Sequence, residues 1–355
     1  MNVSIKQINR FFLLVTAPFV GLFIYLLFSL GPLHIQVDTA AYVPADTLKP
    51  HTDSLLKELD KADKTVKVTI SSISKTSRLY KQTTSAMNAI EATAKTQAGR
   101  PEFIYNKRIT SKLGVPIERV DSDRIRIELY KVNPGVYNGY AMKVKLKDPS
   151  AMGMSLAKDK LGSSETTLQA VSRHGAVAGI NAGGFADTSG KRYPLSTTVM
   201  NGEYLTGFQS SFKDLFFVGL NKSGKLIGGK FQNQSELDRL QPKFGATFVP
   251  MLLKNGQPVE IPLKWKQSPN RAPRTVIGKY KDDQLLIIVV DGRNENGSSG
   301  ATLQELQSKM FHLGVIDAYN LDGGGSSTLV LNGRVVNHPS DGSMRPVPTN
   351  FLFYK

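Results

Sequence analysis

The stretch from residue 316 to residue 331, IDAYNLDGGGSSTLVL, constrains the fold more than any other part of the sequence. One apolar run leads to Asp322, three glycines and a Ser-Ser-Thr segment follow it, and a second apolar run leads away. We therefore predict two strands joined by a polar elbow. Consecutive glycines allow backbone angles that side chains forbid, and they let a ligand approach main-chain N–H groups. An acid at such an elbow is a candidate for chemistry.

The composition is that of a globular protein. With 355 residues, 40% of them hydrophobic, the chain can form one large domain or two smaller ones. It has no cysteine, which excludes disulfides, thiolate nucleophiles and thiolate zinc sites. The formal charge of +16 favours anionic partners such as wall teichoic acids, anionic polysaccharides and phospholipid surfaces, although a basic surface that only aids solubility is the alternative. We expect no nucleic-acid partner, because no dense Lys/Arg run or nucleic-acid-binding signature is present.

The N-terminal region predicts export from the cytoplasm. Residues 11–30 carry no charge and are preceded by Lys6 and Arg10. Their length suits a single-pass transmembrane anchor, with residues 1–10 in the cytoplasm and the C-terminal domain outside the cell. A cleaved signal peptide ending near Ala41 or Ala45 is the alternative, and the long apolar run favours the uncleaved anchor. Both hypotheses place the rest of the protein outside the cytoplasm.

Residues 31–100 are predicted to form a linker and a partly helical stalk. Prolines at positions 32, 44 and 50 suit the linker. From residue 53 to about residue 98 the sequence is rich in Lys, Asp, Glu, Ser, Thr and Ala, and its first apolar residues recur at near-helical spacing. Residues 66–73 alternate as a strand would, so a single continuous helix and an interrupted one both stay open.

The composition and hydrophobic pattern of residues 101–355 are those of one compact domain. Alternating or continuous apolar runs predict strands over residues 124–130, 140–146, 175–180, 215–220, 246–253, 274–279 and 285–290. Helices are predicted over residues 164–173 and 301–313, the second closed by Gly314. Strands outnumber helices and do not alternate regularly with them, which predicts an α+β fold with mixed β-sheets and packed helices.

Three apolar strands end in polar residues beside glycine. These ends are Asn181 with Gly183 and Gly184, Asp291 with Arg293, and Asp322 with Gly323, Gly324, Gly325, Ser326 and Ser327. A single end of this kind is an ordinary turn. Three of them, together with the Arg271–Thr275 segment, favour a shared cleft that holds two carboxylates, arginines, an amide and glycine-rich backbone.

Such a cleft suits hydrolysis of a glycosyl bond to a charged leaving group. Two carboxylates can divide acid and base or nucleophile roles, while arginines and backbone N–H groups bind phosphate. The alternative is that the acids hold a calcium or magnesium ion, although no EF-hand spacing is present. Residues 184–192 look like a phosphate loop, but their glycine spacing is wrong and Arg192 stands where Ser or Thr is required.

Several blocks occur in the order of a known family. They are the segments 181–185, 273–278, 290–293 and 320–328, a helix start with Gly300, Thr302 and Leu306, and Asp341 followed by Arg345. Over about residues 120–355 the sequence resembles the phosphodiester glycosidase (NAGPA-type) domain family, which is related to the lysosomal uncovering enzyme, an N-acetylglucosamine-1-phosphodiester α-N-acetylglucosaminidase. One departure is Ala182, where the family often has a second glycine.

The resemblance implies hydrolysis of a sugar-1-phosphodiester, which releases a sugar and leaves a phosphomonoester. It implies Asp322 and Asp291 as the acid/base or nucleophile pair, Arg293 and Arg274 as phosphate ligands, and Asn181 as a ligand of sugar or phosphate. Ser326 and the glycines would complete the pocket.

The context of the domain bears on the substrate. An anchored domain without cysteines suggests a Gram-positive envelope, where teichoic acids, envelope glycans and exopolysaccharides supply such bonds, and it makes mannose-6-phosphate glycans an unexpected substrate. A non-catalytic, membrane-anchored module that binds anionic wall polymers is the alternative.

Overall fold

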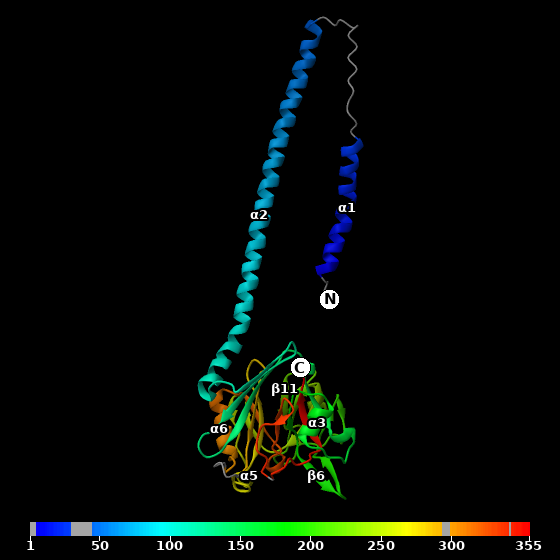
Figure 1. Ribbon diagram of the computed structural model, residues 1–355. Coiled ribbons are helices and arrows are strands. Elements are labelled where there is room, and N and C mark those ends of the chain that lie inside the picture. Colours follow the sequence, from blue (N-terminus) through cyan, green and yellow to red (C-terminus); the bar gives the residue numbers. More distant parts are fainter. Residues whose placement is uncertain (1–4, 30–44, 293–298, 341) are drawn as a thin grey trace. The chain divides into compact units, whose positions relative to one another are not determined.

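The computed structural model describes residues 5–29, 45–292, 299–340 and 342–355, with side chains from residue 12 onward except residues 27 and 45–51 (Figure 1). Arg293 and Asp341, both expected site residues, lie outside this range. The chain divides into two compact units, Met1–Glu91 and Ala92–Lys355. Each unit is described by itself.

The first unit contains α1 (Ile5–Ser29) and most of α2 (Ala45–Leu113), which continues into the second unit. Residues 66–73 are helical, although their alternation of apolar and polar residues is also compatible with a strand. Threonine hydroxyls in this helix donate to carbonyls one turn back, as Thr69 does to Thr65 over 2.8 Å. Ion pairs such as Lys64–Asp60 at 2.6 Å add support along the helix surface.

Hydrophobicity and length decide whether a helix can cross a bilayer. The span expected over residues 11–30 coincides with α1, but no helix in the described part of the chain is long and apolar enough to cross a membrane.

The second unit is built on three sheets and a hairpin. The central sheet has the order β1 (Glu118–Asp121), β2 (Ile125–Val132), β3 (Gly139–Leu146), β16 (Leu285–Val290), β15 (Arg274–Lys279), β17 (Asp317–Leu321), β13 (Met251–Lys254), β14 (Gln257–Pro258). A second sheet has the order β11 (Leu226–Gly229), β10 (Phe216–Asn221), β12 (Pro242–Phe248), β8 (Val199–Met200), β9 (Glu203–Tyr204). The third has the order β19 (Arg334–Val335), β18 (Leu329–Leu331), β5 (Ala178–Asn181), β20 (Thr349–Phe353), β4 (Met152–Leu156), and the hairpin is β6 (Phe185–Thr188) with β7 (Lys191–Pro194).

Short helices and turns complete the unit. The helices are α3 (Thr167–Arg173), α4 (Gln234–Asp238), α5 (Leu263–Gln267) and α6 (Leu303–Leu313), and single 3-10 turns are η1 (Pro149–Ala151), η2 (Ala157–Asp159) and η3 (Gly324–Ser326). In α6, Thr302 and Glu305 form a capping box and Gly314 closes the helix at φ 83°. The predicted helix end at Gly314 is confirmed.

The α+β class is confirmed, but the expectation of mixed sheets is wrong. Every strand pairing within the described residues is antiparallel. The reason lies in the strand order. β16 and β17 are joined through α6 and run in the same direction, yet β15 lies between them and pairs with both.

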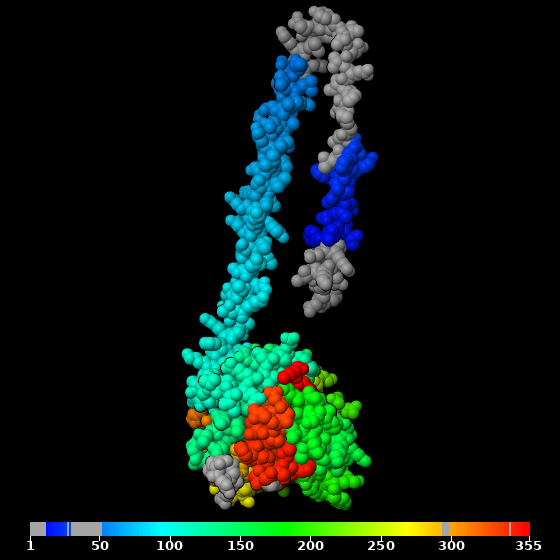
Figure 2. Space-filling model, in the orientation of Figure 1, coloured from blue at the N-terminus to red at the C-terminus, as the bar shows by residue number. Residues whose placement is uncertain are grey.

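Two apolar cores hold the unit together. The larger core joins one face of the central sheet to the other two sheets, through residues such as Ile287, Phe216 and Phe351. The other face of the central sheet packs against α6 and the end of α2, where Ile109 is fully buried. Figure 2 shows the last turns of α2, in cyan, as part of the second unit.

Candidate functional site

The strand register brings three expected site residues to one edge of the central sheet. Arg274, the first residue of β15, pairs with Val290, the last of β16, and Thr275 pairs with Leu321, the last of β17. Asp291 and Asp322 therefore leave the sheet at the same edge, one strand on either side of β15. With neighbouring strands about 4.8 Å apart, the ends of β16 and β17 are separated by about 10 Å.

The turn after β17 is held by main-chain hydrogen bonds. Asp322 N donates to Ala182 O over 3.1 Å, and Gly324 N donates to Pro273 O over 2.9 Å. Gly324 has φ +60°, and a Cβ on Gly323 would lie 3.0 Å from Pro273 O. Glycine is needed at these two positions for the turn to dock on the segment before β15.

Asn181 holds this turn from the side of β5. Its Nδ2 donates to Asp322 O over 2.6 Å, and its Oδ1 accepts from Thr275 Oγ1 at 2.8 Å and Thr328 N at 3.1 Å. The side chain is fully buried. These contacts connect β5, β15 and the turn, so the geometry gives Asn181 a positioning role.

Gly183 and Gly184 lie against β12. A Cβ on Gly183 would approach Ala246 Cβ to 2.5 Å, and one on Gly184 would approach Phe248 Cδ2 to 2.5 Å. The absence of a side chain at both positions allows close packing against β12.

The pKa of the Asp322 carboxylate is shifted far from its ordinary value. Burial raises its pKa to about 6, although Ser326, the Gly323 N–H and the charges of Arg345 and Arg192 act in the opposite direction. Gly323 N donates to Oδ1 over 3.0 Å, and the Ser326 hydroxyl is near enough to act on the carboxylate as a hydrogen-bond donor. A buried carboxylate with a pKa near neutrality can take up or release a proton at physiological pH.

Buried polar atoms gather around the same turn. Within the described part of the chain, Arg274 Nε, Ser327 Oγ and Thr328 Oγ1 make no hydrogen bond. Buried polar groups are normally paired with protein, water or a ligand. Their concentration makes the turn a candidate site for a polar ligand.

Basic side chains surround Asp322. Arg192, on β7, lies over the Phe185 ring at 4.1 Å and pairs with both oxygens of Asp187 at 2.7 and 2.9 Å. The charge of Arg345 acts on Asp187 as well as on Asp322. Arg192 is a site residue that the sequence did not reveal, because its segment resembled only a defective phosphate loop.

Arg274 lies beneath the turn. It is 6% exposed, its guanidinium donates to Pro269 O over 2.9 Å, and burial lowers its pKa to about 10. It remains a cation at neutral pH. Its Cδ would lie 3.8 Å from a Cβ on Gly323, which places it against the Asp322 turn.

Asp291 has different surroundings. Its Oδ1 accepts from His338 N over 2.8 Å, and His338 Nδ1 lies 3.5 Å from Oδ2. Burial raises its pKa, with the contacts to His338 acting against the shift. It lines a cavity of 240 Å³ with Asn138, Tyr140 and His338, and Asp322 is not among the lining residues. The two aspartates share a sheet edge, but their described contacts do not overlap.

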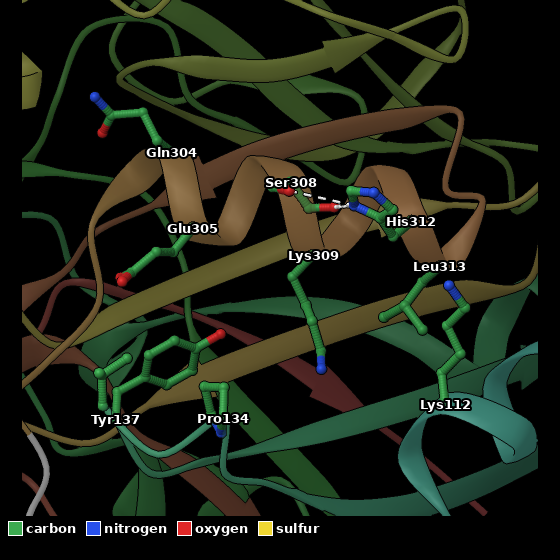
Figure 3. Close-up of a pocket in the computed structure, with 10 residues that line it drawn as sticks. Lys112, Pro134, Tyr137, Gln304, Glu305, Ser308, Lys309, His312 and Leu313 are labelled. Atoms are coloured by element: carbon green, nitrogen blue, oxygen red, sulfur yellow. Dashed lines mark hydrogen bonds between the residues drawn. The ribbon is translucent and has the colours of Figure 1, made fainter.

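A larger cavity of 650 Å³ contains none of the expected site residues. Figure 3 shows it between the last turn of α2, which carries Lys112, the loop that carries Pro134 and Tyr137, and α6 with Lys309 and His312. No group of three or more potential metal-ligating side chains occurs among the described residues. The possible calcium or magnesium ion stays a hypothesis.

Comparison with known proteins identifies the domain. The family model described as phosphodiester glycosidase matches residues 174–354. This chain belongs to the phosphodiester glycosidase family. The match includes the Asn181 turn, the Arg274 segment and the Asp322 turn.

Proteins similar to this chain include a bacterial and an animal protein. The "SPbeta prophage-derived uncharacterized protein YomE" of Bacillus subtilis is 31% identical over 187 residues, which cover 52% of this chain and 28% of that protein. The N-acetylglucosamine-1-phosphodiester α-N-acetylglucosaminidase of Bos taurus is 33% identical over 137 residues, which cover 35% of this chain and 26% of that protein. The matched regions thus span little more than a quarter of these relatives.

Solved structures of low sequence identity share the fold. The catalytic domain of the zebrafish N-acetylglucosamine-1-phosphodiester α-N-acetylglucosaminidase, described as auto-inhibited by its pro-peptide, is 19% identical with a TM-score of 0.54, and the match covers 68% of this chain and 89% of that one. A hypothetical protein from Synechocystis gives a TM-score of 0.50 at 16% identity, with 68% of this chain and 64% of that one covered. These structures share the fold of about two thirds of this chain.

Proposed function

We propose that this domain hydrolyses a sugar-1-phosphodiester into a free sugar and a phosphomonoester. Membership of the phosphodiester glycosidase family supports the reaction class. The observation that carries the proposal is Asp322, whose buried carboxylate has a pKa of about 6 and lies close enough to Ser326 and two arginines for them to act on its charge. The names of the animal relatives make an N-acetylglucosamine phosphodiester the first substrate to test.

In this proposal Asp322 is a general base. Its Oδ2 takes a proton from a water molecule as the water oxygen forms a bond to the anomeric carbon. The bond between that carbon and the phosphate oxygen breaks, and its electron pair leaves with the phosphomonoester. A phosphate oxygen whose monoester has a second pKa near 6 departs without a strong acid. Direct displacement by water inverts the anomeric configuration.

Arginines bind the anionic part of the substrate. Arg192 and Arg345 place positive charge beside Asp322, and Arg274 supplies a buried cation beneath the turn. Guanidinium groups match the geometry of phosphate oxygens and stabilise charge that grows on the leaving group. Ser326 and the glycine backbone would contribute further donors. Arg293 and Asp341, outside the described residues, stay predicted ligands.

Asp291 is a candidate for a structural role at the site. Its contact with His338 and its separate cavity favour shaping of the site over direct proton transfer. A catalytic pair of Asp291 and Asp322 makes a different prediction: substitution of either aspartate would then abolish most of the activity.

The proposed substrate is a phosphate-containing glycan or wall polymer outside the cytoplasm. The uncharged residues 11–30 after Lys6 and Arg10 support export, with or without a membrane anchor. The net charge of +16 suits an anionic polymer of a bacterial envelope. Cell fractionation with an antibody against residues 92–355 would test this location, and recovery of the protein in the cytoplasm would contradict it.

A direct assay separates catalysis from simple binding. The purified protein is incubated with α- and β-linked N-acetylglucosamine-1-phosphodiesters and with phosphodiesters of other sugars, and free sugar and phosphomonoester are measured together. Equal amounts of both products support the proposal. Tight binding of teichoic acid with no product from any donor would support the alternative, a non-catalytic module for anionic wall polymers.

A further inference from the structure

The helix α2 exposes a regular row of apolar side chains. Leu59, Val66, Ile73, Tyr80 and Met87 follow one another at intervals of seven residues. They are between 54% and 74% exposed. All described side chains of residues 52–91 are exposed, so no described element covers this row. Water-exposed apolar residues in such order indicate an interaction surface.

A second row lies beside the first. Its members are also seven residues apart, and each lies four residues before the next member of the first row or three after the previous one. They are Leu55, Ala62, Thr69, Thr76, Thr83 and Ile90. Together the rows repeat as the a and d positions of a heptad over about five heptads, and a strict seven-residue repeat is the signature of a left-handed coiled coil. We call these eleven residues the α2 seam.

The charges of α2 avoid the seam. The basic residues of this part of the helix fall at other heptad positions: Lys57, Lys61, Lys64, Lys67, Lys75, Arg78, Lys81 and Lys95. The ion pairs Lys64–Asp60 and Lys67–Asp63, both at 2.6 Å, are formed within the helix and need no partner. A helix that packed against an anionic polymer would present its lysines to it, whereas the α2 seam presents uncharged side chains.

The strict seven-residue repeat argues for a helical partner rather than a lipid surface. A helix that lies in a membrane interface gathers its apolar residues on one broad face, whereas α2 repeats the seam every seven residues and also exposes Leu56, Val68, Ile70 and Leu79 outside it. A partner must instead supply a helix with the same seven-residue repeat. A second copy of this chain supplies one, with lysines directed away from the contact on both helices.

We propose that α2 pairs with α2 of a second copy of this chain through the α2 seam, in a coiled coil. The contact is made by residues 55–90, a length of about 54 Å at 1.5 Å per residue. It joins catalytic domains into an oligomer without using any residue of the Asp322 site. Linked domains bind a repeating polymer more tightly than single ones, because the second binding event becomes intramolecular.

Two neighbouring substitutions test the seam. Ile73→Lys puts a charge in the seam, while Ser74→Lys puts the same residue at the next position, outside both rows. The molar mass of the full-length protein is measured by sedimentation in a non-ionic detergent that masks residues 12–29. We expect an oligomer for the wild-type chain and for Ser74→Lys, and self-association at least about tenfold weaker for Ile73→Lys. Circular dichroism would verify that both variants keep their helix content.

Cross-linking gives a second readout, because the chain has no cysteine of its own. The Thr76→Cys variant, in the seam, and the Ser71→Cys variant, outside it, are oxidised and run on a non-reducing gel. A covalent dimer for Thr76→Cys alone supports a parallel, in-register seam, and equal mass of the Ile73→Lys and wild-type proteins would overturn the proposal. A monomeric wild-type chain at about 10 μM would also overturn it.

Discussion

The amide of Asn181 donates a hydrogen bond of 2.6 Å to the main-chain carbonyl of Asp322. The bond fixes the backbone of the aspartate and makes no contact with its carboxylate. The carboxylate of Asp322 is thereby held in place through its own backbone. A residue expected to bind sugar or phosphate thus acts, in this structure, as the support of the carboxylate.

We predict that Asn181→Ala both destabilises the domain and lowers its activity. The substitution leaves the Asp322 carbonyl, the Thr275 hydroxyl and the Thr328 N–H without their bonds in a buried site. The expected loss is about 2–4 kcal/mol of unfolding free energy, measured by denaturant titration. Asn88→Ala, on the exposed surface of α2, is the matched control and should change stability by less than about 0.5 kcal/mol.

Gly183→Ala tests whether close packing beneath the site matters. The new Cβ would lie 2.5 Å from Ala246 Cβ and 3.0 Å from Thr247 O, so β12 or the Asn181 turn must shift. We expect a loss of about 1–3 kcal/mol and a lower kcat. Gly99→Ala has no atom within 4 Å of its new Cβ and lies in a helix, so it should stabilise slightly. Equal thermal unfolding temperatures for the two variants would refute this packing argument.

The pH dependence of hydrolysis should report the pKa of Asp322. Since burial raises that pKa to about 6 and a general base acts when deprotonated, kcat/KM should rise about tenfold per pH unit below 6 and level off above it. Arg345 lowers the pKa of Asp322, so Arg345→Gln should move the midpoint to higher pH. A profile without an inflection between pH 5 and 7 would conflict with Asp322 as the base.

The raised pKa of Asp322 also makes the stability of the fold depend on pH. The folded-state pKa of Asp322 is raised above its unfolded value of 3.8, so between about pH 4 and 6 the folded protein binds more protons. The contribution of Asp322 to stability is therefore fully present below pH 4 and is lost as the pH rises through 6. Asp322→Asn should remove this component from the difference in unfolding free energy between pH 4 and pH 7.

A buried ion pair lies within the central sheet, and its lysine also contacts α2. Lys143, 2% exposed, donates to Glu128 over 2.7 Å and to Asn106 of α2. Burial acts to raise the pKa of Glu128, but the hydrogen bond and charge of Lys143 and the charge of Arg126 outweigh it, so the pKa is lowered. Lys143→Met should cost about 3 kcal/mol, because it leaves a buried carboxylate without its main partner. Adding Glu128→Gln should restore part of that loss, and a further loss in the double variant would contradict the pairing.

The sequence predicted the strands of the site well. Residues 285–290 are continuously apolar and residues 275–277 are β-branched, and the structure has β16 over residues 285–290 and β15 over residues 274–279. Helix α6 was also predictable, since its capping residues and Gly314 are local signals. The run at residues 246–253 is instead divided between β12 and β13 at Val249 and Pro250, where proline has no N–H for a ladder bond.

Long-range register was not predictable from the same signals. The position of β15 between β16 and β17 determines which strand ends meet, and no local pattern encodes it. The charge of Arg192, on the β6–β7 hairpin, acts on Asp322 although the two residues lie far apart in the sequence. Whether Asp291 contacts His338 or Asp322 likewise depends on contacts between residues far apart in the chain.

The rate of sugar release by Asp322→Asn tests the central claim most directly. The substitution keeps the size of the side chain and removes the base, so we predict that kcat falls by about 10²–10⁴-fold while the circular dichroism spectrum stays unchanged. Asp291→Asn, measured beside it, should lose no more than about tenfold. Wild-type turnover in a folded Asp322→Asn protein would contradict the assignment of Asp322 as the catalytic base.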